Sequence, residues 1–490
     1  MLLAIDQGTT GTTCIVFDHE GELLGRAYRE FKQHFPHPGW VEHDAQEIWE
    51  TSHAVAGEAL EDAGAEPGEL DAIGITNQRE TIVVWDPSTG EPLHRALVWQ
   101  DRRTAKRCEE LRDQGHLDLV RRKTGLVIDP YFSGTKIEWL LNNVDGLKEK
   151  AENGNAVFGT IDAWLLFKLT GEHATEPSNA SRTMLLDITT GEWDDELLDL
   201  FGVPAKSLPE VRPSCGELGT TTEDFHGHAV PVAGILGDQQ AALFGQRCTD
   251  PGAGKNTYGT GSFVLQNAGP NAPDAPEGLL GTVAWQVGNQ TTYALEAAIF
   301  VTGAAVQWLR DGLEIIASAD ETEALAGSLD SNDGVYFVPA LTGLGSPHWD
   351  PYARGTIVGL TRGSTKAHFA RGALEAMAYQ TVDAVRAMED STGEALEELK
   401  ADGGATVNRW LMQFQADILG VPVKVPEVAE TTALGAALMA SVGCGHQTLA
   451  DVKAAGEPKA TYEPSMDEDE RATLLEGWHR ALERSRGWAQ

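Results

Sequence analysis

Two stretches of this chain share one pattern, and this repeat limits the folds that the chain can adopt. Leu2 to Phe17 (LLAIDQGTTGTTCIVF) and Lys255 to Asn267 (KNTYGTGSFVLQN) each carry two apolar runs around a turn rich in Gly and Thr. Such alternation around a glycine-bearing turn predicts a β-hairpin. Glycine N–H groups and threonine hydroxyls can hold phosphate, although either turn alone fits an ordinary tight turn equally well. Together they predict two similar domains that face one nucleotide.

Polar residues follow several predicted strands. The strand 71–76 leads into Asn77 to Glu80 (NQRE), and the apolar segment 234–237 leads into Asp238 and Gln239. A third turn, DGGATVN at 402–408, follows the strand that begins at Leu399. Polar groups gathered just past buried strands commonly form a site. We therefore expect these segments to meet.

The remaining pattern alternates between strands and helices, which is typical of an α/β protein. Apolar spacing and turn residues predict further strands at 81–85 and 93–99 and a loop at 125–136. The same criteria predict helices at 45–63, 102–114, 241–245, 300–311, 365–389, 409–419 and 471–486, and the small residues at 431–439 indicate close packing.

The charge balance excludes some partners. The chain has 74 acidic and 37 basic residues in 490, a net charge of −37, and such a surface repels nucleic acid and anionic lipid. The acidic residues are scattered, which suits a protein that stays soluble in concentrated salt, so we expect a halophilic cytoplasm. No apolar run approaches a membrane span. The five cysteines have no metal-ligand spacing and are expected to be reduced thiols.

The chain resembles the FGGY carbohydrate kinases almost from end to end. The resemblance is carried by GITNQRET (74–81), VWQDRRT (98–104), GLVIDPYFSGTK (125–136), SNASRTMLLDI (178–188), GDQQAALFGQ (237–246), KNTYGTGSF (255–263), WDPYARG (349–355), DGGA (402–405) and LMQFQADILG (411–420). It implies two ribonuclease-H-like α/β domains of the actin and hexokinase type, expected at 1–247 and 248–490, with a nucleotide and substrate cleft between them. NQRE and IDPYFSGTK resemble the members that phosphorylate glycerol with ATP and Mg²⁺.

The resemblance assigns seven residues to glycerol: Arg79, Glu80, Trp99, Tyr131, Asp238, Gln239 and Phe263. Their chemistry agrees with a small triol, which needs donors and acceptors for its hydroxyls and flat apolar walls for its carbons. Asp238 is the expected general base for the attacking hydroxyl.

A second set is assigned to the nucleotide: Thr9, Thr10, Gly11, Thr260, Gly303, Gln307, Gly404 and Asn408. Asn408 begins a helix whose N-terminal N–H groups would face the site. Asp6 and Asp238 are expected to organise Mg²⁺ through water.

Each residue also has an ordinary structural explanation. Trp99 and Phe263 alone would more often be core residues, and Arg79 with Glu80 would usually form a surface ion pair. Asp238 alone would equally well cap the following helix. Two other activities fit the same fold: a kinase of a larger polyol or ketose, and a nucleotide-driven binding protein of the actin or chaperone type.

The sequence departs from the family pattern at three places. Many members have Ser where this chain has Gly11 and Arg where it has Thr13, so we expect one cationic phosphate contact to be missing. Some members bind fructose 1,6-bisphosphate through a Gly-rich loop with an Arg, but 224–230 (DFHGHAV) has none, so this regulation is expected to be absent. Members are often dimers or tetramers, which makes a homo-oligomer the expectation here.

Overall fold

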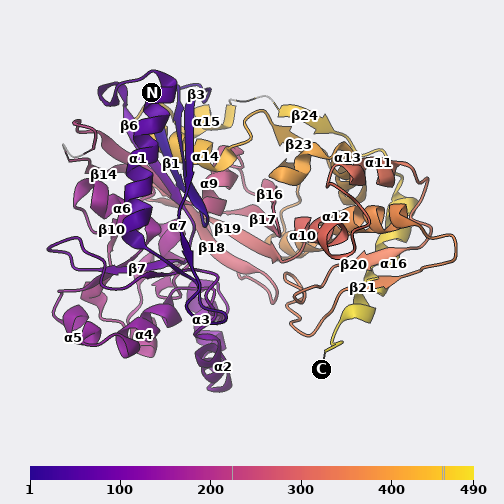
Figure 1. Cartoon of the computed structure of the whole chain (residues 1–490), viewed down its shortest axis with the longest axis horizontal. Helices are drawn as coiled ribbons and strands as arrows, with labels where there is room; N and C mark the ends of the chain where they lie inside the picture. Colours follow the sequence, from indigo (N-terminus) through magenta and orange to yellow (C-terminus); the bar gives the residue numbers. More distant parts are fainter. Residues whose placement is uncertain (223–224, 455, 457, 490) are drawn as a thin grey trace.

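The computed structural model describes residues 1–222, 225–454, 456 and 458–489. The chain forms two bodies, one built mainly from the N-terminal half (residues 1–247) and the other mainly from the C-terminal half (residues 248–490) (Figure 1). Each body contains a large mixed sheet. The predicted boundary between residues 247 and 248 stays a prediction.

The first sheet has the strand order β14-β15-β6-β1-β2-β3. Its strands are β1 (Leu2–Gln7), β2 (Gly11–Phe17), β3 (Leu23–Glu30), β6 (Ala72–Asn77), β14 (Cys215–Thr220) and β15 (Pro231–Gly237). The second sheet has the order β18-β19-β17-β16-β22-β23-β24. Its strands are β16 (Gly254–Tyr258), β17 (Ser262–Gly269), β18 (Leu280–Val287), β19 (Gln290–Ile299), β22 (Leu399–Asp402), β23 (Val423–Pro426) and β24 (Pro458–Tyr462).

The two sheets repeat one topology. In the first, β1 pairs antiparallel with β2 and parallel with β6, which pairs parallel with β15. In the second, β16 pairs antiparallel with β17 and parallel with β22, which pairs parallel with β23. The predicted repeat of the Gly/Thr hairpin is therefore confirmed, and both turns lie at equivalent places in the two sheets.

A third, smaller sheet extends the N-terminal half in the order β4-β5-β8-β7-β9. Its strands are β4 (Gln33–His34), β5 (Glu42–His43), β7 (Ile82–Trp85), β8 (Ala96–Leu97) and β9 (Val157–Thr160). The short strands β10 (Ala174–Thr175) and β13 (Glu210–Val211), β11 (Leu186–Asp187) and β12 (Glu192–Trp193), and β20 (Tyr336–Val338) and β21 (Thr356–Val358) form separate pairs.

Local capping explains the ends of the first long helix. The helix α1 begins after Asp44, whose carboxylate accepts the N–H groups of Gln46 and Glu47, and it ends at Gly64, which has a φ of 65°. The other helices are α2 (Ala105–Asp113), α3 (Leu117–Thr124), α4 (Gly134–Asn143), α5 (Leu147–Glu152), α6 (Ile161–Thr170), α7 (Pro177–Ala180), α8 (Asp195–Phe201), α9 (Asp238–Gly245), α10 (Gly303–Gln307), α11 (Glu321–Gly327), α12 (Lys366–Thr392), α13 (Arg409–Leu419), α14 (Thr431–Gly443), α15 (Leu449–Ala454) and α16 (Glu468–Ser485).

Several predicted elements have other bounds in the structure: the helices predicted at 102–114, 241–245 and 471–486, for example, are Ala105–Asp113, Asp238–Gly245 and Glu468–Ser485. The strand predicted at 93–99 is only Ala96–Leu97, and the loop predicted at 125–136 ends at 133, because α4 begins at Gly134. The helix predicted at 300–311 begins later, at Gly303, because the N–H groups of Thr302 and Gly303 donate to the carbonyls of the Gly/Thr turn of the second hairpin. It then passes into a π turn at Trp308–Gly312.

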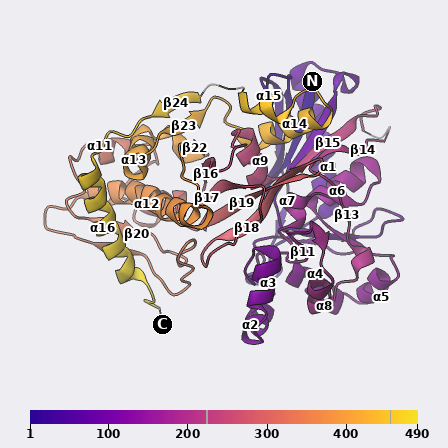
Figure 2. The ribbon, with the colours of Figure 1, turned by 180° about the vertical axis from the view of Figure 1, so that it is seen from behind.

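Helix α14 belongs to the C-terminal half but lies against the sheet of the N-terminal half (Figures 1 and 2). Small residues permit this close approach. A Cβ atom on Gly74 of β6 would lie 2.2 Å from the carbonyl oxygen of Ala436, and one on Gly435 would lie 1.9 Å from that of Ala241. The chain therefore crosses back between β23 and β24 of the second sheet and ties the two bodies together.

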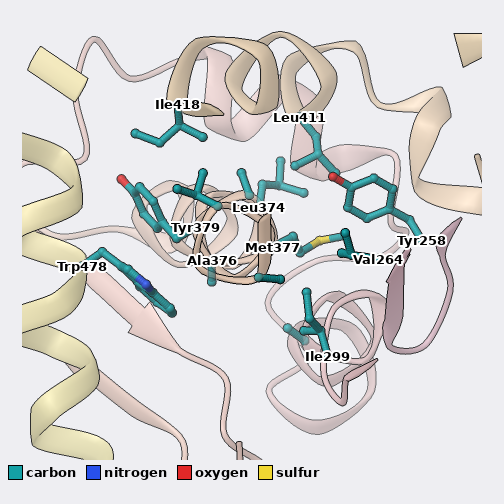
Figure 3. Close-up of a cluster of buried hydrophobic side chains, with 14 of the residues drawn as sticks. Tyr258, Val264, Ile299, Leu374, Ala376, Met377, Tyr379, Leu411, Ile418 and Trp478 are labelled. Carbon is teal, nitrogen blue, oxygen red and sulfur yellow. The ribbon is translucent and has the colours of Figure 1, made fainter. Parts of the chain in front are cut away.

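The core of the C-terminal half forms around α12, as Figure 3 shows. Tyr379 of this helix stacks on Trp478 of α16, with ring centroids 5.3 Å apart. Tyr258, at the end of β16, packs in the same core and donates a hydrogen bond of 2.6 Å to Gln415 Oε1. This contact fixes the strand from which the second Gly/Thr turn projects.

All five cysteines are free, as expected, and Cys14, Cys108 and Cys248 are buried. Among the described residues, no helix is both long and apolar enough to cross a membrane.

Candidate active site

The first Gly/Thr turn lies between β1 and β2. The N–H group of Gly8 donates to the carbonyl of Gly11 at 2.9 Å, which closes the turn. Thr10 is exposed, whereas the hydroxyl of Thr9 accepts a hydrogen bond of 2.9 Å from Nε1 of Trp99. This bond joins a residue predicted for the nucleotide to one predicted for glycerol.

The structure explains one departure from the family pattern. A Cβ atom on Gly11 would lie 2.6 Å from the carbonyl oxygen of Arg29 and 2.7 Å from the ring of Tyr28. Tyr28 pairs across the sheet with Thr13, so its ring covers this part of the turn. A Ser at position 11 would collide with these groups, and only glycine fits without a shift.

The second Gly/Thr turn borders a cavity of about 540 Å³. Five of the predicted nucleotide residues line it: Thr260, Gly303, Gln307, Gly404 and Asn408. Leu374 and Met377 add an apolar part. A Cβ atom on Gly303 would lie 2.5 Å from the carbonyl oxygen of Gly259, so α10 can start this close to the turn only with glycine.

Asn408 also sets the geometry of this cavity. Its side-chain oxygen accepts the N–H of Leu411 at 2.9 Å, which caps α13, and its Nδ2 donates to Thr322 Oγ1 at 3.2 Å. Thr322 and Arg310 line the same cavity, but the sequence analysis did not single them out. Neither residue lies in a motif that carried the family resemblance.

Asp6 and Asp238 bring two carboxylates to the edge where β1 and β15 end. Asp6 is half-buried at the end of β1, and Asp238 is the first residue of α9. Burial and the negative charges of Asp238 and Glu430 raise the pKa of the Asp6 carboxyl to about 7. Carboxylates that repel each other in this way favour a cation, and their oxygen atoms are the ligands that Mg²⁺ prefers.

Asp238 does not act as a conventional helix cap. The N-cap residue of α9 is Gly237, and Oδ1 of Asp238 accepts only the adjacent N–H, that of Gln239, at 2.7 Å. The same oxygen lies 3.0 Å from Nε of Arg79. About a third of the Asp238 side chain is exposed, so the carboxylate faces both the buried arginine and the open part of the site.

Arg79 belongs to a buried ionic network that spans both halves. Its Nη1 lies 2.6 Å from Oε2 of Glu296 on β19, and Glu296 Oε1 lies 2.8 Å from Nη2 of Arg182. Nε of Arg182 in turn lies 2.7 Å from Oε1 of Glu80. Each of these four side chains is at most 2% exposed. Arg79 and Glu80 themselves approach to 3.9 Å, but both side chains are buried, so they do not form the surface ion pair of the ordinary explanation.

The network sets the charges of its carboxyl groups. Burial alone would raise the pKa of Glu296, but the charges of Arg182 and Arg79 outweigh burial and lower it to about 2. Burial raises the pKa of Glu80, against the opposing effect of the same two arginines. Glu80 also has a φ of 63°, a strained conformation for a residue with a side chain, which is typical of functional sites.

An aromatic wall lies beside this network. The rings of Trp99 and Tyr131 meet edge to face at 5.6 Å, and Nη2 of Arg79 donates to the hydroxyl of Tyr131 at 3.4 Å. The loop that carries Tyr131 is held by Lys136, whose buried Nζ donates to the carbonyls of Pro130, Tyr131 and Phe132. The structure therefore brings Arg79, Trp99 and Tyr131 together with Asp238.

Gln239 on α9 of the N-terminal half and Phe263 on β17 of the C-terminal half both lie next to β16. Oε1 of Gln239 accepts a hydrogen bond of 2.6 Å from Nζ of Lys255, which also donates to Thr257 Oγ1 at 2.8 Å. Phe263 pairs with Thr257 across β16 and β17. Within the described residues, no ring contact joins Phe263 to Trp99 or Tyr131. Phe263 packs instead at the edge of the core between α9 and α14.

Besides Arg310 and Thr322, sequence reasoning missed four residues around the ionic network: Arg182, Gln240, Lys255 and Glu296. Arg182 and Lys255 lie in motifs that carried the resemblance, but nothing marked their charges as buried. Glu296 lies in an apolar strand, and its partner Arg79 is 217 residues away in sequence. No local pattern could identify such a pair.

Comparison with known proteins agrees with this geometry. The N-terminal domain of the FGGY family of carbohydrate kinases matches residues 1–245, and the C-terminal domain of that family matches residues 254–444. The chain is 55% identical to the glycerol kinase of Deinococcus radiodurans, over 99% of this chain and 98% of that protein. It is 53% identical to glycerol kinase 2 of Thermotoga maritima, over 99% of both chains.

A solved structure shows the same arrangement of domains. The crystal structure of Plasmodium falciparum glycerol kinase with ADP superposes with a TM-score of 0.94 and 34% identity, over 99% of this chain and 98% of that one. The two-domain α/β fold and the matches along the sequence lead to one conclusion: this chain belongs to the FGGY family of carbohydrate kinases.

Proposed function

We propose that this chain is an ATP:glycerol 3-phosphotransferase, which transfers the γ-phosphoryl group of ATP to glycerol and gives sn-glycerol 3-phosphate. The observation that carries the proposal is the position of Asp238. Its carboxylate lies beside Arg79, one of the residues predicted to bind glycerol. It is also close enough to Asp6, near the end of β1, to raise the pKa of Asp6. The names and identities of the relatives, and the ADP in the Plasmodium structure, support the same activity.

The acceptor would bind between the aromatic wall and the ionic network. Trp99 and Tyr131 offer flat apolar surfaces for the carbon chain, and Phe263 would close the site from the C-terminal half. Arg79 and Gln239 supply donors for hydroxyl oxygens, and Glu80 supplies an acceptor. The network holds Arg79 in place through Glu296, so the guanidinium is oriented before the substrate arrives.

Asp238 would take the proton of the attacking hydroxyl as its oxygen approaches the γ-phosphorus. Phosphoryl transfer requires the protein mainly to position the reactants, neutralise charge and exclude water. Arg79 keeps Oδ1 of Asp238 in place at 3.0 Å, so the proton acceptor is fixed relative to the substrate residues.

The nucleotide would lie with its adenosine part in the cavity of the C-terminal half and its phosphates between the two Gly/Thr turns. Thr9, Thr10 and Gly11 face these phosphates from one side and Thr260 from the other. Asp6 and Asp238 would hold Mg²⁺ through water, and their carboxylate oxygens fit that ion. The bound ion supplies neutralisation of the phosphate charge.

Two alternative functions predict different results. A kinase of a larger polyol or ketose would use the same fold and the same base, but its best acceptor would be a longer sugar. A binding protein of the actin or chaperone type would hydrolyse ATP slowly, without dependence on any alcohol. The charged groups gathered around Asp238 favour small-molecule chemistry over this second rival.

Coupled ADP release, measured with and without glycerol at several KCl concentrations, tests the proposal. We expect release to depend on glycerol, and we expect glycerol to exceed xylulose, ribulose and erythritol in kcat/KM. Preference for one of the longer acceptors would establish the first rival. ADP release that is slow and unaffected by every alcohol would establish the second.

We also propose the salt conditions, the oligomeric state and the regulation of this activity. The net charge of −37 supports a halophilic cytoplasm. Because family members are often dimers or tetramers, a homo-oligomer is the proposed state. Activation or inhibition by fructose 1,6-bisphosphate is expected to be absent, because segment 224–230 contains no Arg. Asp224, at the start of that segment, lies outside the described residues.

A further inference from the structure

A buried lysine joins the two halves at the proposed acceptor site. Lys255 lies on β16 of the C-terminal half and has no solvent exposure. Its Nζ lies 2.6 Å from Oε1 of Gln239, the second residue of α9 in the N-terminal half, and 2.8 Å from Oγ1 of Thr257. A fully buried lysine is uncommon and needs compensating partners.

Charged neighbours oppose the effect of burial on this lysine. Burial lowers the pKa of Lys255 to about 8, while Asp402, Asp238 and Glu296 act in the opposite direction. Lys255 in turn helps to keep Glu296 ionised. The ammonium group therefore belongs to the same electrostatic system as the ionic network, although it is not part of the chain of ion pairs that joins Arg79 to Glu80.

The chemistry of lysine determines the orientation of Gln239. An ammonium group has three donors and no acceptor, so the amide of Gln239 must turn its oxygen toward Lys255. Nε2 of Gln239 then points away from Lys255, and the structure gives it no hydrogen-bond partner among the described residues. This amide can offer only a donor to a ligand.

We propose that Lys255 is a positioning residue for the acceptor alcohol: by holding Oε1 of Gln239, it aims Nε2 at a substrate hydroxyl beside Asp238. The inference rests on the proposed function, since it requires an alcohol as acceptor. Asp238 lies close enough to the contact between Lys255 and Gln239 to raise the pKa of Lys255, so a hydroxyl bound there can accept from Nε2 of Gln239 and donate its proton to the Asp238 carboxylate. A carbonyl oxygen, which only accepts, cannot make both contacts. The pair therefore selects a hydroxyl group.

The same contact links acceptor binding to the arrangement of the two halves. Gln239 lies on the N-terminal half and Lys255 on the C-terminal half, so the amide is correctly oriented only when the halves are in this relative position. A movement that separates β16 from α9 would release the amide and weaken acceptor binding. Lys255 therefore connects the shape of the cleft to the affinity for the alcohol.

Lys255→Met, which keeps the unbranched shape and all but the last atom of the side chain and removes the charge, tests this role. We expect the KM for glycerol to rise about 10-fold or more, because the amide is no longer held in one orientation, while the KM for ATP changes less than about 3-fold. The matched control is Lys400→Met. Nζ of Lys400 on β22 also reaches across to the N-terminal half, where it meets the carbonyl of Gln246 at 2.8 Å, but it makes no contact with Gln239.

A double-mutant cycle separates positioning from a general loss of structure. In a Gln239→Ala background, Lys255→Met should raise the glycerol KM by less than about 2-fold, because the residue that it positions is gone. Full additivity of the two effects, or an equal effect of Lys400→Met, would overturn the inference.

Gln239→Glu keeps the inference testable if Lys255→Met does not fold. The carboxylate of Glu still pairs with Lys255, but it has no donor for the substrate, so the glycerol KM should rise as strongly as in Gln239→Ala. An unchanged KM would refute the donor role. A wild-type protein that phosphorylates no alcohol would overturn the proposed function and this inference together, whereas an active kinase without coupling between Lys255 and Gln239 would overturn only the inference.

Discussion

Arg79 and Glu296 form a buried ion pair, 2.6 Å long, between the two halves of the chain. Glu296 also binds Arg182, so one carboxylate compensates two arginines that are shielded from water. Removing one partner of a buried pair leaves a charge without compensation, which costs about 3 to 5 kcal/mol. The position of Glu296 thus matters for stability as well as for the acceptor site.

Glu296→Gln should therefore lower the stability by about 3 kcal/mol, because Arg79 and Arg182 lose their shared anion. The thermal midpoint measures this loss, and Asp250→Asn is the control. Asp250 forms an exposed ion pair of 2.7 Å with Lys453, for which a change below about 1 kcal/mol is expected. Equal thermal midpoints for Glu296→Gln and the control would show that the ionic network does not contribute this stability.

Much of the fold could be predicted from local sequence signals. The helix 45–63 was predicted with its observed ends, because Asp44 and Gly64 cap it locally. Both Gly/Thr hairpins were predicted as well, because alternation and turn chemistry act over a few residues. Of the predicted nucleotide positions, Thr260, Gly303, Gln307, Gly404 and Asn408 line one cavity.

The rest depends on contacts between distant segments. The small residues of α14 indicated close packing, but nothing in the sequence indicated that its partner is the sheet of the N-terminal half. The pairing of Lys255 with Gln239 and that of Arg79 with Glu296 likewise exist only after both halves have folded. A charge in an apolar strand is visible in a sequence, but its partner is not.

The acidic surface predicts a dependence on salt. With a net charge of −37, the folded chain repels itself when ions do not screen the charges, and screening shortens from about 10 Å at 0.1 M to about 3 Å at 1 M salt. The thermal midpoint should rise by roughly 5 °C or more between about 0.1 M and about 3 M KCl. An equal or higher midpoint at the lower salt concentration would contradict the halophilic proposal.

The pair that His479 of α16 forms with Asp383 of α12 predicts that the stability of the fold depends on pH. Nε2 of His479 lies 2.8 Å from Oδ1 of Asp383, and Nε1 of Trp478 donates to Oδ2 at 2.7 Å. The hydrogen bond to Asp383 raises the pKa of His479 above 6.5, although burial and Arg386 oppose this and Glu483 supports it. Burial would raise the pKa of Asp383, but the nearby His348, whose Nε2 lies 3.7 Å from Oδ2, and the hydrogen bonds from His479 and Trp478 lower it below 3.8.

The directions of these two pKa shifts define the pH range in which the pair of His479 and Asp383 stabilises the fold. The raised pKa of His479 gives a contribution that is complete below about pH 6.5 and is lost as the pH rises through the folded value. The lowered pKa of Asp383 gives a contribution that is complete above about pH 4 and is lost as the pH falls through the folded value. The pair should therefore contribute fully between about pH 4 and 6.5.

His479→Gln tests this range. Because nearly half of the His479 side chain is exposed, the loss should stay below about 1 kcal/mol near pH 5.5 and shrink toward pH 9. His94→Gln is the control, since Nδ1 of His94 meets the backbone carbonyl of Arg95 and no carboxylate. Thermal midpoints of both variants across pH measure the effect. A loss that is independent of pH would contradict an ionic origin.

Asp238→Asn tests the chemistry itself. The primary hydroxyl of an alcohol is a poor nucleophile at neutral pH, and a carboxylate within hydrogen-bond reach can take its proton as the bond to phosphorus forms. Asn keeps the shape of the side chain, and its oxygen can still lie beside Nε of Arg79, but it cannot take a proton. The variant should fold and bind glycerol with little loss, while kcat falls roughly 10²- to 10⁴-fold.

Two measurements separate the base from the metal role of the same residue. Because Asp238 and Asp6 are also proposed to organise Mg²⁺, kcat must be compared at saturating Mg²⁺, where weaker metal binding no longer limits the rate. Asp6→Asn serves as the control: it should raise the Mg²⁺ concentration required for half-maximal activity and recover most of its kcat at saturation. If Asp238→Asn keeps more than about a tenth of the wild-type kcat under these conditions, Asp238 is not the base, because a positioned general base contributes at least about 10²-fold.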